Sequence, residues 1–331
     1  MLNLRPIIIR YTFKDGTVPM QGKLTGKVTK STRSQYQVYV DNRMLTCVVR
    51  GKLVGLKESD ISSIKVGDDV VVELTGETEG VILDILPRKS KLSRAVEGKA
   101  YKEHIIATNI DQMVIISSTK NPAFKAGLID RYLVIAEKND LSAVICLNKI
   151  DLAEAEQFEE YATTYRALNY EFFYTSVLTG QGMDHLHDIL KNKLSVMVGQ
   201  SGVGKSSLIQ KIEPGLELAV SETSEKTSKG RHTTSYVELF PLSFGGYIID
   251  TPGIRELGLW DIYRNDLRKY FVEMVAVQEN CQFGDCQHLL EPGCAVKTAV
   301  EEGQIFPERY KNYTNIYQDL RAASYELIKR R

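Results

Sequence analysis

Residues 199–207 read GQSGVGKSS and match the phosphate-binding pattern G-x-x-x-x-G-K-[ST]. An apolar segment precedes this loop and a helical segment follows it, a context that a chance glycine-rich turn would lack. The glycines let the backbone curl so that successive N–H groups face phosphate oxygens, and the helix N-terminus adds positive partial charge. We expect Lys205 to reach the β- and γ-phosphates and the Ser206 hydroxyl to bind Mg²⁺. The predicted phosphate-binding residues are Gly199, Gln200, Ser201, Gly202, Val203, Gly204, Lys205, Ser206 and Ser207.

A second motif, NKID, predicts that the bound base is guanine. It directly follows the apolar strand AVICL, so it lies at the carboxyl end of a parallel strand, where ligands bind. The carboxylate of Asp151 can accept from guanine N1–H and from its 2-amino group. Adenine offers neither donor, and the unpaired carboxylate would disfavour adenine by a factor of about 10⁴.

The neighbours of Asp151 have expected roles in the same pocket. Asn148 would brace the loop and contact the base edge, and the stem of Lys149 would pack over the ring, with Ile150 completing the motif. The segment TSVLTG, residues 175–180, follows the next predicted strand. A backbone N–H from the region of Ser176 can then reach guanine O6.

Two further elements follow the phosphate loop along the chain. In YIIDTPG, residues 247–253, Asp250 is expected to hold Mg²⁺ through water, and the Gly253 N–H is expected to sense the γ-phosphate. The polar segment SKGRHTTS offers Thr233 and Thr234, one of which should complete the Mg²⁺ shell with Ser206; we favour Thr234.

The catalytic machinery predicted from these segments is incomplete. Residue 254, where many GTPases carry a glutamine that orients water, is isoleucine, which can do no polar chemistry. His232 is a candidate for positioning the attacking water; the alternatives are that it contacts RNA or orders its loop. The catalytic set expected here is His232, Thr234, Asp250, Gly253 and Lys205. We therefore predict slow intrinsic hydrolysis and strong activation by a partner.

Three of the five cysteines lie in one short stretch, CQFGDCQHLLEPGC. Three thiolates and one imidazole form a closed tetrahedral ligand set that suits structural Zn²⁺ and leaves no position for catalysis. Buried thiols are the alternative interpretation, and it is the one we apply to Cys47 and Cys146. The odd number of cysteines argues against a disulfide framework. The predicted zinc ligands are Cys281, Cys286, His288 and Cys294.

The elements that must position these residues divide the chain into segments. Residues 21–88 contain five short β segments that predict a small barrel, with the OB-fold as the leading candidate. After a basic linker at 87–99, strands alternate with helices through residue 261, which predicts a parallel sheet covered on both faces. Residues 262–331 are mainly helical around the cysteine-rich stretch. The N-terminal extension is placed at 1–20; we hypothesise that Met20 is the native start and that residues 1–19 are an upstream misread or an extension.

The composition, 43% hydrophobic and 25% charged, fits a soluble globular protein. No apolar run approaches the roughly 20 residues of a membrane helix, so we expect a cytoplasmic protein. Residues 1–57 carry eleven Lys or Arg residues against Asp15 and Asp41. This basic block favours contact with a polyanion, although a solubilising surface is the alternative.

The order of the motifs is NKID, TSVLTG, GQSGVGKSS, GRHTT and DTPG, which resembles that of circularly permuted GTPases. GRHTT, DTPGIRELGLW and CQFGDCQHLLEPGCAV together resemble the ribosome-small-subunit-dependent GTPase A family (RsgA type), over about residues 21–331. The resemblance implies a multidomain protein: an N-terminal OB-fold β-barrel, a central circularly permuted α/β P-loop GTPase domain at 89–261, and a C-terminal, mainly α zinc-binding domain at 262–331.

The resemblance also implies a role in late maturation of the small (30S) ribosomal subunit, with hydrolysis accelerated by that subunit. The implied ligands are GTP and GDP, Mg²⁺ and one structural Zn²⁺, and the implied partners are the small subunit and its 16S rRNA. We expect a monomer with no membrane or DNA partner. Because the chain runs from DTPG directly into the C-terminal region, we also expect the nucleotide state to orient that region.

Two other functions are disfavoured by the same motifs. A P-loop kinase or ATPase is disfavoured by NKID and by the lack of a segment that could serve as a substrate lid. An rRNA-binding protein that uses GTP only as a structural ligand is disfavoured by the intact Lys205, Ser206 and Asp250.

Overall fold

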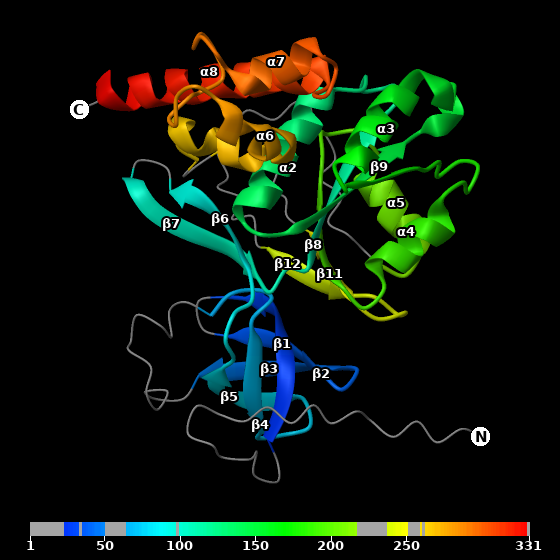
Figure 1. Ribbon diagram of the computed structural model, residues 1–331. Helices are drawn as coiled ribbons and strands as arrows, with labels where there is room; N and C mark the ends of the chain where they lie inside the picture. The colour runs from blue at the N-terminus through cyan, green and yellow to red at the C-terminus, as the bar shows by residue number, and fades with distance from the viewer. Residues whose placement is uncertain are drawn as a thin grey trace. The chain divides into compact units, whose positions relative to one another are not determined.

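The structure is a computed structural model that describes residues 23–32, 35–49, 64–96, 99–216, 237–250, 259 and 262–329; within these, the side chains of 94–104, 250 and 321–329 are not described. The predicted extension at 1–20 lies outside these residues. The chain divides into two compact units, Met1–Ile64 with Asp68–Pro87, and Lys65–Gly67 with Arg88–Arg331 (Figure 1).

The first unit is a five-stranded barrel, as the sequence predicts. Its strands occur in the order β1-β2-β3-β5-β4, and β4 pairs back with β1, so that the sheet closes on itself. The β3–β5 pair is parallel and the other pairs are antiparallel. Alternate side chains, among them Val28, Val38 and Leu45, point into the core and are fully buried. The strands are β1 (Lys23–Ser31), β2 (Tyr36–Val40), β3 (Arg43–Val49), β4 (Asp69–Leu74) and β5 (Glu79–Ile85).

The second unit contains a sheet whose strands run in the order β10-β9-β8-β11-β13-β12. All neighbours are parallel except β12, which is antiparallel to β13. The elements, in chain order, are β8 (Gln112–Ser118), α2 (Ala126–Lys138), β9 (Ser142–Asn148), η1 (Ile150–Leu152), η2 (Ala155–Phe158), α3 (Glu159–Ala167), β10 (Glu171–Tyr174), α4 (Met183–Leu190), β11 (Leu194–Val198), α5 (Lys205–Ile212), β12 (Glu238–Pro241) and β13 (Tyr247–Asp250).

Helices cover both faces of this sheet, which explains why β8 is buried along its whole length. Met113 and Ile115 of β8 pack in the same cluster as residues of α2 and α3. The alternate residues Val114 and Ile116 pack with residues of α4 and α5. The predicted α/β organisation of this region is therefore confirmed.

The prediction of a linker at 87–99 is wrong in the second part of this segment. Residues Lys91–Val96 form strand β6, which pairs with β7 (Lys99–Thr108) in a two-stranded antiparallel sheet. Leu92 is fully buried against the core of the second unit, where it pairs with Ala107. The apolar residues Leu92, Ala95 and Val96 do not alternate with the polar residues of this segment, so its pattern does not predict a strand.

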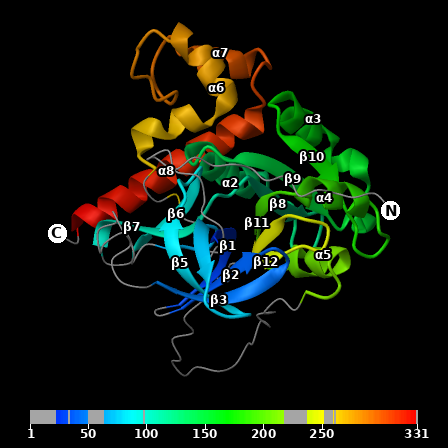
Figure 2. The same cartoon turned by 90° about the horizontal axis from the view of Figure 1, so that it is seen from below.

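The C-terminal region is helical and packs against α2 in the second unit (Figure 2). Its last helix, α8, buries Tyr313, Ile316, Tyr317 and Leu320. None of the described helices combines the length and hydropathy needed to cross a membrane. The elements are η4 (Arg264–Tyr270), α6 (Val272–Val277), η5 (Gln278–Asn280), α7 (Ala295–Glu301) and α8 (Pro307–Lys329).

Candidate nucleotide site and metal centre

Three of the predicted nucleotide-binding segments meet at one edge of the sheet. The phosphate loop follows β11, NKID begins at the end of β9, and TSVLTG begins at the end of β10. Because β11 and β9 both pair in parallel with β8, and β10 with β9, the carboxyl ends of these strands lie side by side. This edge is where open α/β sheets bind ligands.

The phosphate loop has a backbone that only glycine can adopt at two of its positions. Gly199 has φ +147°, and a Cβ there would lie 2.1 Å from the carbonyl oxygen of Ile116. Gly204 has φ +98°, and a Cβ there would lie 2.4 Å from Nδ2 of Asn148. Helix α5 starts at Lys205, immediately after the loop, so its N-terminus faces the position expected for the phosphates. The amino group of Lys205 donates to the carbonyls of Gly199 and Gln200, at 2.6 and 3.0 Å.

NKID is hydrogen-bonded directly to the phosphate loop. Asn148, which is buried, donates from Nδ2 to the carbonyl of Val203 at 2.9 Å, and its Oδ1 accepts from Thr175 at 3.1 Å. The amino group of Lys149 donates to the carbonyl of Gly202 at 2.7 Å. The base-reading and phosphate-binding segments therefore form one hydrogen-bonded assembly.

The carboxylate of Asp151 is oriented by TSVLTG. The buried Ser176 donates its hydroxyl to Oδ1 of Asp151 at 2.5 Å, while its own backbone N–H donates to the carbonyl of Gln181. The Ser176 amide is thus already engaged in the turn. The amides of Val177 and Leu178 have no hydrogen-bond partner among the described residues.

A segment that the sequence analysis did not single out supports both loops. Thr119 donates to the carbonyl of Lys149 at 2.6 Å, and the Lys149 amino group donates to the carbonyl of Asn121. Ser118 donates to the carbonyl of Pro122 at 2.7 Å. This segment directly follows the buried strand β8 at the ligand-binding edge, and that position is the signal that could have identified it.

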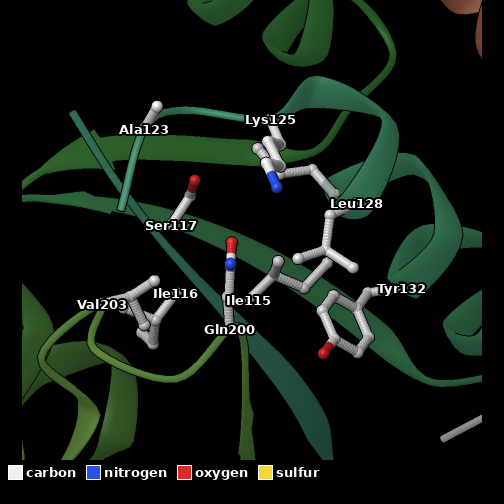
Figure 3. Close-up of a pocket in the computed structure, with 10 residues that line it drawn as sticks. Ile115, Ile116, Ser117, Ala123, Lys125, Leu128, Tyr132, Gln200 and Val203 are labelled. Carbon is white, nitrogen blue, oxygen red and sulfur yellow. The ribbon is translucent and has the colours of Figure 1, made fainter. Parts of the chain in front are cut away.

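A small cavity of about 10 Å³ lies between this segment, α2 and the phosphate loop (Figure 3). Gln200 and Val203 of the loop form one side of it. Leu128 and Tyr132 of α2 form the other side, with Lys125 at the start of the helix. Helix α2 therefore lies beside the phosphate loop, with this small cavity between them.

The predicted switch and catalytic residues are only partly within the described chain. Asp250 ends β13, which pairs with the phosphate-loop strand β11, but its side chain is not described. His232, Thr233, Thr234, Gly253 and Ile254 lie outside the described residues. Ser206, the other expected Mg²⁺ ligand, is exposed in the first turn of α5.

The four predicted zinc ligands come together. The ligand atoms of Cys281, Cys286, His288 and Cys294 all lie within 4.8 Å of one another. Nδ1 of His288 is 3.6 Å from Sγ of Cys281 and 3.5 Å from Sγ of Cys294. Zn–N and Zn–S bonds of about 2.0 and 2.3 Å in a tetrahedron require donor separations of this size. The residues present therefore fit Zn²⁺.

The remaining cysteines lie apart from this cluster. Cys47 is buried in the barrel, and burial raises the pKa of its thiol to about 11. Cys146 is buried in β9, and burial raises the pKa of its thiol to about 12. Both fit the interpretation as core thiols.

The metal loop is held by groups that contact its backbone. Tyr310 and Tyr313 of α8 donate to the carbonyls of His288 and Gln287, at 2.7 and 2.8 Å. The carboxylate of Glu291 accepts from the N–H groups of Gln287 and Leu289. Burial favours a raised pKa for Glu291, but the backbone N–H groups outweigh it and lower this pKa.

The comparisons with known proteins agree with this geometry. The sequence model of the RsgA GTPase matches residues 85–260, and that of the RsgA N-terminal domain matches residues 25–82. The chain belongs to the RsgA GTPase family.

Relatives of the RsgA family match nearly the whole chain. One from Caldanaerobacter subterraneus subsp. tengcongensis, named small ribosomal subunit biogenesis GTPase RsgA, is 40% identical over 299 residues, which are 90% of this chain and 96% of that protein. Another of the same name, from Chlorobaculum parvum, is 41% identical over 310 residues, covering 91% and 99%.

Two solved structures have the same fold over nearly the whole chain. YjeQ from Thermotoga maritima matches with a TM-score of 0.74 at 36% identity and covers 90% of this chain and 98% of that chain. YloQ, described as a circularly permuted GTPase, matches with a TM-score of 0.72 at 31% identity, covering 92% and 96%. The permuted motif order inferred from the sequence is thus a feature of this RsgA fold.

Proposed function

We propose that this RsgA family member is a GTP phosphohydrolase that binds the small (30S) ribosomal subunit and assists its late maturation, with the subunit as activator of hydrolysis. The observation that carries the GTP assignment is the Asp151 carboxylate, which Ser176 orients at the strand edge beside the phosphate loop. The assignment to the small subunit is supported by the printed names of the relatives.

The proposed nucleotide site assigns each segment one task. The phosphate loop binds the phosphates through its backbone N–H groups, and Lys205 leaves the carbonyls of Gly199 and Gln200 to reach the β- and γ-phosphates. When bound, Mg²⁺ neutralises the charge that develops on the phosphates; Ser206, Asp250 and Thr234 are the residues proposed to hold it. His232 is proposed to position the attacking water.

The cluster of Cys281, Cys286, His288 and Cys294 is proposed to bind one structural Zn²⁺, which would fix the loop between η5 and α7. We propose residues 262–331 as a zinc-binding helical domain, 89–261 as the permuted GTPase domain and 21–88 as the OB-fold domain. The basic N-terminal region is the proposed contact with 16S rRNA. The protein is proposed to act as a cytoplasmic monomer without DNA or membrane partners.

The proposal is tested by measuring GTP hydrolysis by the full chain with and without purified small subunits. We expect slow turnover alone and strong stimulation by small subunits but not by large ones, with GTP preferred over ATP in competition. Co-sedimentation with each subunit, in GDP and in a non-hydrolysable GTP analogue, measures binding separately. Binding to small subunits without stimulation would instead favour an RNA-binding protein with a structural nucleotide, and tight ATP binding would overturn the GTP assignment.

A further inference from the structure

A buried polar network joins helix α8 to helix α2. None of its residues is among the proposed nucleotide or metal ligands. At its centre is Asp130 of α2, whose side chain has no exposed surface. Its Oδ1 accepts from Nη1 of Arg309 at 2.6 Å and from the hydroxyl of Tyr165 at 2.7 Å. Its Oδ2 accepts from Nδ2 of Asn312 at 2.6 Å. Both carboxylate oxygens are therefore satisfied, two of the three donors coming from α8.

The other edge of Arg309 is satisfied by α6. Its Nε and Nη2 donate to the two carboxylate oxygens of Glu273, at 2.7 and 2.9 Å. The guanidinium carbon also lies 4.7 Å from the centre of the Phe271 ring. With 3% of its side chain exposed, Arg309 is fixed by a planar fork geometry that a lysine could not reproduce.

The helix that carries Asp130 also shapes the nucleotide site. Two residues further along α2, Tyr132 lines the cavity beside Gln200 and Val203 of the phosphate loop (Figure 3). The backbone of Gly199 interacts with the Tyr132 oxygen and partly offsets the rise in its pKa that burial causes. The N-terminal end of α2 continues the segment that supports Lys149.

Helix α8 in turn is attached to the metal loop. Tyr310 and Tyr313 donate to the backbone carbonyls of His288 and Gln287, while Arg309 and Asn312 of the same helix contact Asp130. A continuous series of hydrogen-bonded and packed groups thus runs from the metal loop through α8 and α2 to the phosphate loop. Such a series can transmit coupling between sites, but only a measurement of the coupling establishes it.

We propose that Asp130 and Arg309 are positioning residues for the nucleotide site, which make nucleotide affinity depend on the metal loop. If the metal loop releases α8, Asp130 loses Arg309 and Asn312 and is left buried without a cation. A buried, uncompensated carboxylate is unfavourable, so α2 must shift and with it the Tyr132 side of the phosphate loop. The inference rests on nucleotide binding at the loops assigned above.

Linkage makes the proposal quantitative. If Zn²⁺ at the Cys281 cluster strengthens nucleotide binding by some factor, nucleotide must strengthen Zn²⁺ binding by the same factor. Typical couplings between sites lie at about 5- to 150-fold. We therefore expect removal of Zn²⁺ to weaken GDP binding at least about 5-fold and saturating GDP to tighten Zn²⁺ to the same extent.

The experiment uses the full chain, zinc-loaded or stripped with a chelator and checked for folding by circular dichroism. GDP affinity is measured with a fluorescent GDP analogue, and Zn²⁺ affinity by competition with a chromophoric chelator in the presence and absence of GDP. Equal GDP affinities in both forms, or a Zn²⁺ affinity indifferent to GDP, would overturn the inference. A zinc-loaded wild type that binds no GDP would instead overturn the proposed nucleotide site.

Variants then test whether Asp130 and Arg309 carry the coupling. Arg309→Met should reduce the coupling factor towards 1, and Asn312→Ala, which leaves the buried charges paired, should reduce it partly even if Arg309→Met does not fold. Arg131→Ala is the matched control, because Arg131 also joins α2 to α8, through the exposed Asp319. It should leave the coupling unchanged. Variants of Arg309 and Asn312 that lose thermal stability but keep the wild-type coupling factor would show a merely structural role and refute the proposal.

Discussion

The hydroxyl of Ser176 donates to the carboxylate of Asp151 across 2.5 Å, and so joins two loops that follow neighbouring strands. Ser176 is buried and held by its own turn, in which its Oγ also accepts from the N–H of Thr179. The carboxylate therefore has a defined orientation before any base binds. Preorganisation of this kind lowers the entropic cost of ordering the carboxylate when the base binds.

Replacing Asp151 with asparagine should change which purine is bound. The asparagine amide keeps one oxygen that can accept from N1–H but offers an N–H in place of the other, so it repels the 2-amino group of guanine and pairs with the C2 carbonyl of xanthine. We expect GTP affinity to fall by about 10² or more, since the hydrogen bond from the 2-amino group is lost and the one from N1–H no longer has a charged acceptor, while XTP affinity rises. Calorimetric titration with both nucleotides measures the change.

The matched control for Asp151→Asn is Asp188→Asn, which removes a carboxylate on α4 that is 76% exposed. It should leave both affinities unchanged. An Asp151→Asn protein that binds GTP as tightly as the wild type would mean that this carboxylate does not contact the base.

Ser176→Ala should weaken guanine nucleotides only modestly. It removes the hydrogen bond that orients Asp151 but leaves the carboxylate in place. The net worth of a hydrogen bond to a charged group is about 1.5–3 kcal/mol, and the lower value corresponds to roughly a 10-fold loss of GDP affinity. Because the carboxylate is freed and not removed, preference for GDP over ADP should persist, as a competition titration can determine. A complete loss of GDP binding would contradict this role.

The motifs of this site could be predicted because their chemistry is local. The glycines of residues 199–204 and the polar residues of NKID follow buried strands directly, and parallel strands bring their carboxyl ends together. The cysteines and the histidine close together in residues 281–294 likewise predict the metal cluster. The barrel and the alternating strands and helices follow from hydrophobic patterns that extend over many residues.

Other features depend on contacts that no local pattern encodes. Asp130 and Arg309 are separated by 179 residues, and in the sequence each is an ordinary charge within a helical segment. The side-chain role of Ser176 depends on the turn that consumes its N–H, so the sequence indicated only a backbone donor. Strand β6 depends on pairing with β7, most of which lies outside the segment, so the segment alone does not predict it.

Zn²⁺ binding should release protons and weaken as the pH falls. Burial raises the pKa of the Cys286 thiol to about 12 in the metal-free protein, so this thiol is protonated at pH 7 and must lose its proton to become a ligand. Burial lowers the pKa of His288, so its imidazole is already neutral at pH 7. Lowering the pH favours the protonated thiol and opposes the metal, whereas raising it does the reverse.

Calorimetric Zn²⁺ titrations at pH 7, in buffers of different ionisation enthalpy, count the protons released. We expect at least one per Zn²⁺, and an affinity that falls about 10-fold or more per pH unit in this range. Zinc binding without proton release would mean that the Cys286 thiol is already ionised or is not a ligand. The Cys47→Ala variant, altered at a thiol outside the cluster, should release the same number of protons as the wild type.

Gly204→Ala should abolish most nucleotide binding, because its effect is not confined to backbone strain. The φ of +98° disfavours any L side chain by about 1–2 kcal/mol, and the new Cβ would also lie 2.4 Å from Nδ2 of Asn148. Asn148 would then have to release the carbonyl of Val203 and separate NKID from the phosphate loop.

Gly303→Ala provides the control: it has a similar φ of +75°, but no atom lies within 4 Å of its Cβ. We expect Gly303→Ala to lower the thermal unfolding temperature and keep the wild-type GDP affinity, whereas Gly204→Ala should weaken GDP by about 10² or more. Equal GDP affinities for the two variants would show that the contact between Asn148 and the phosphate loop does not control nucleotide binding.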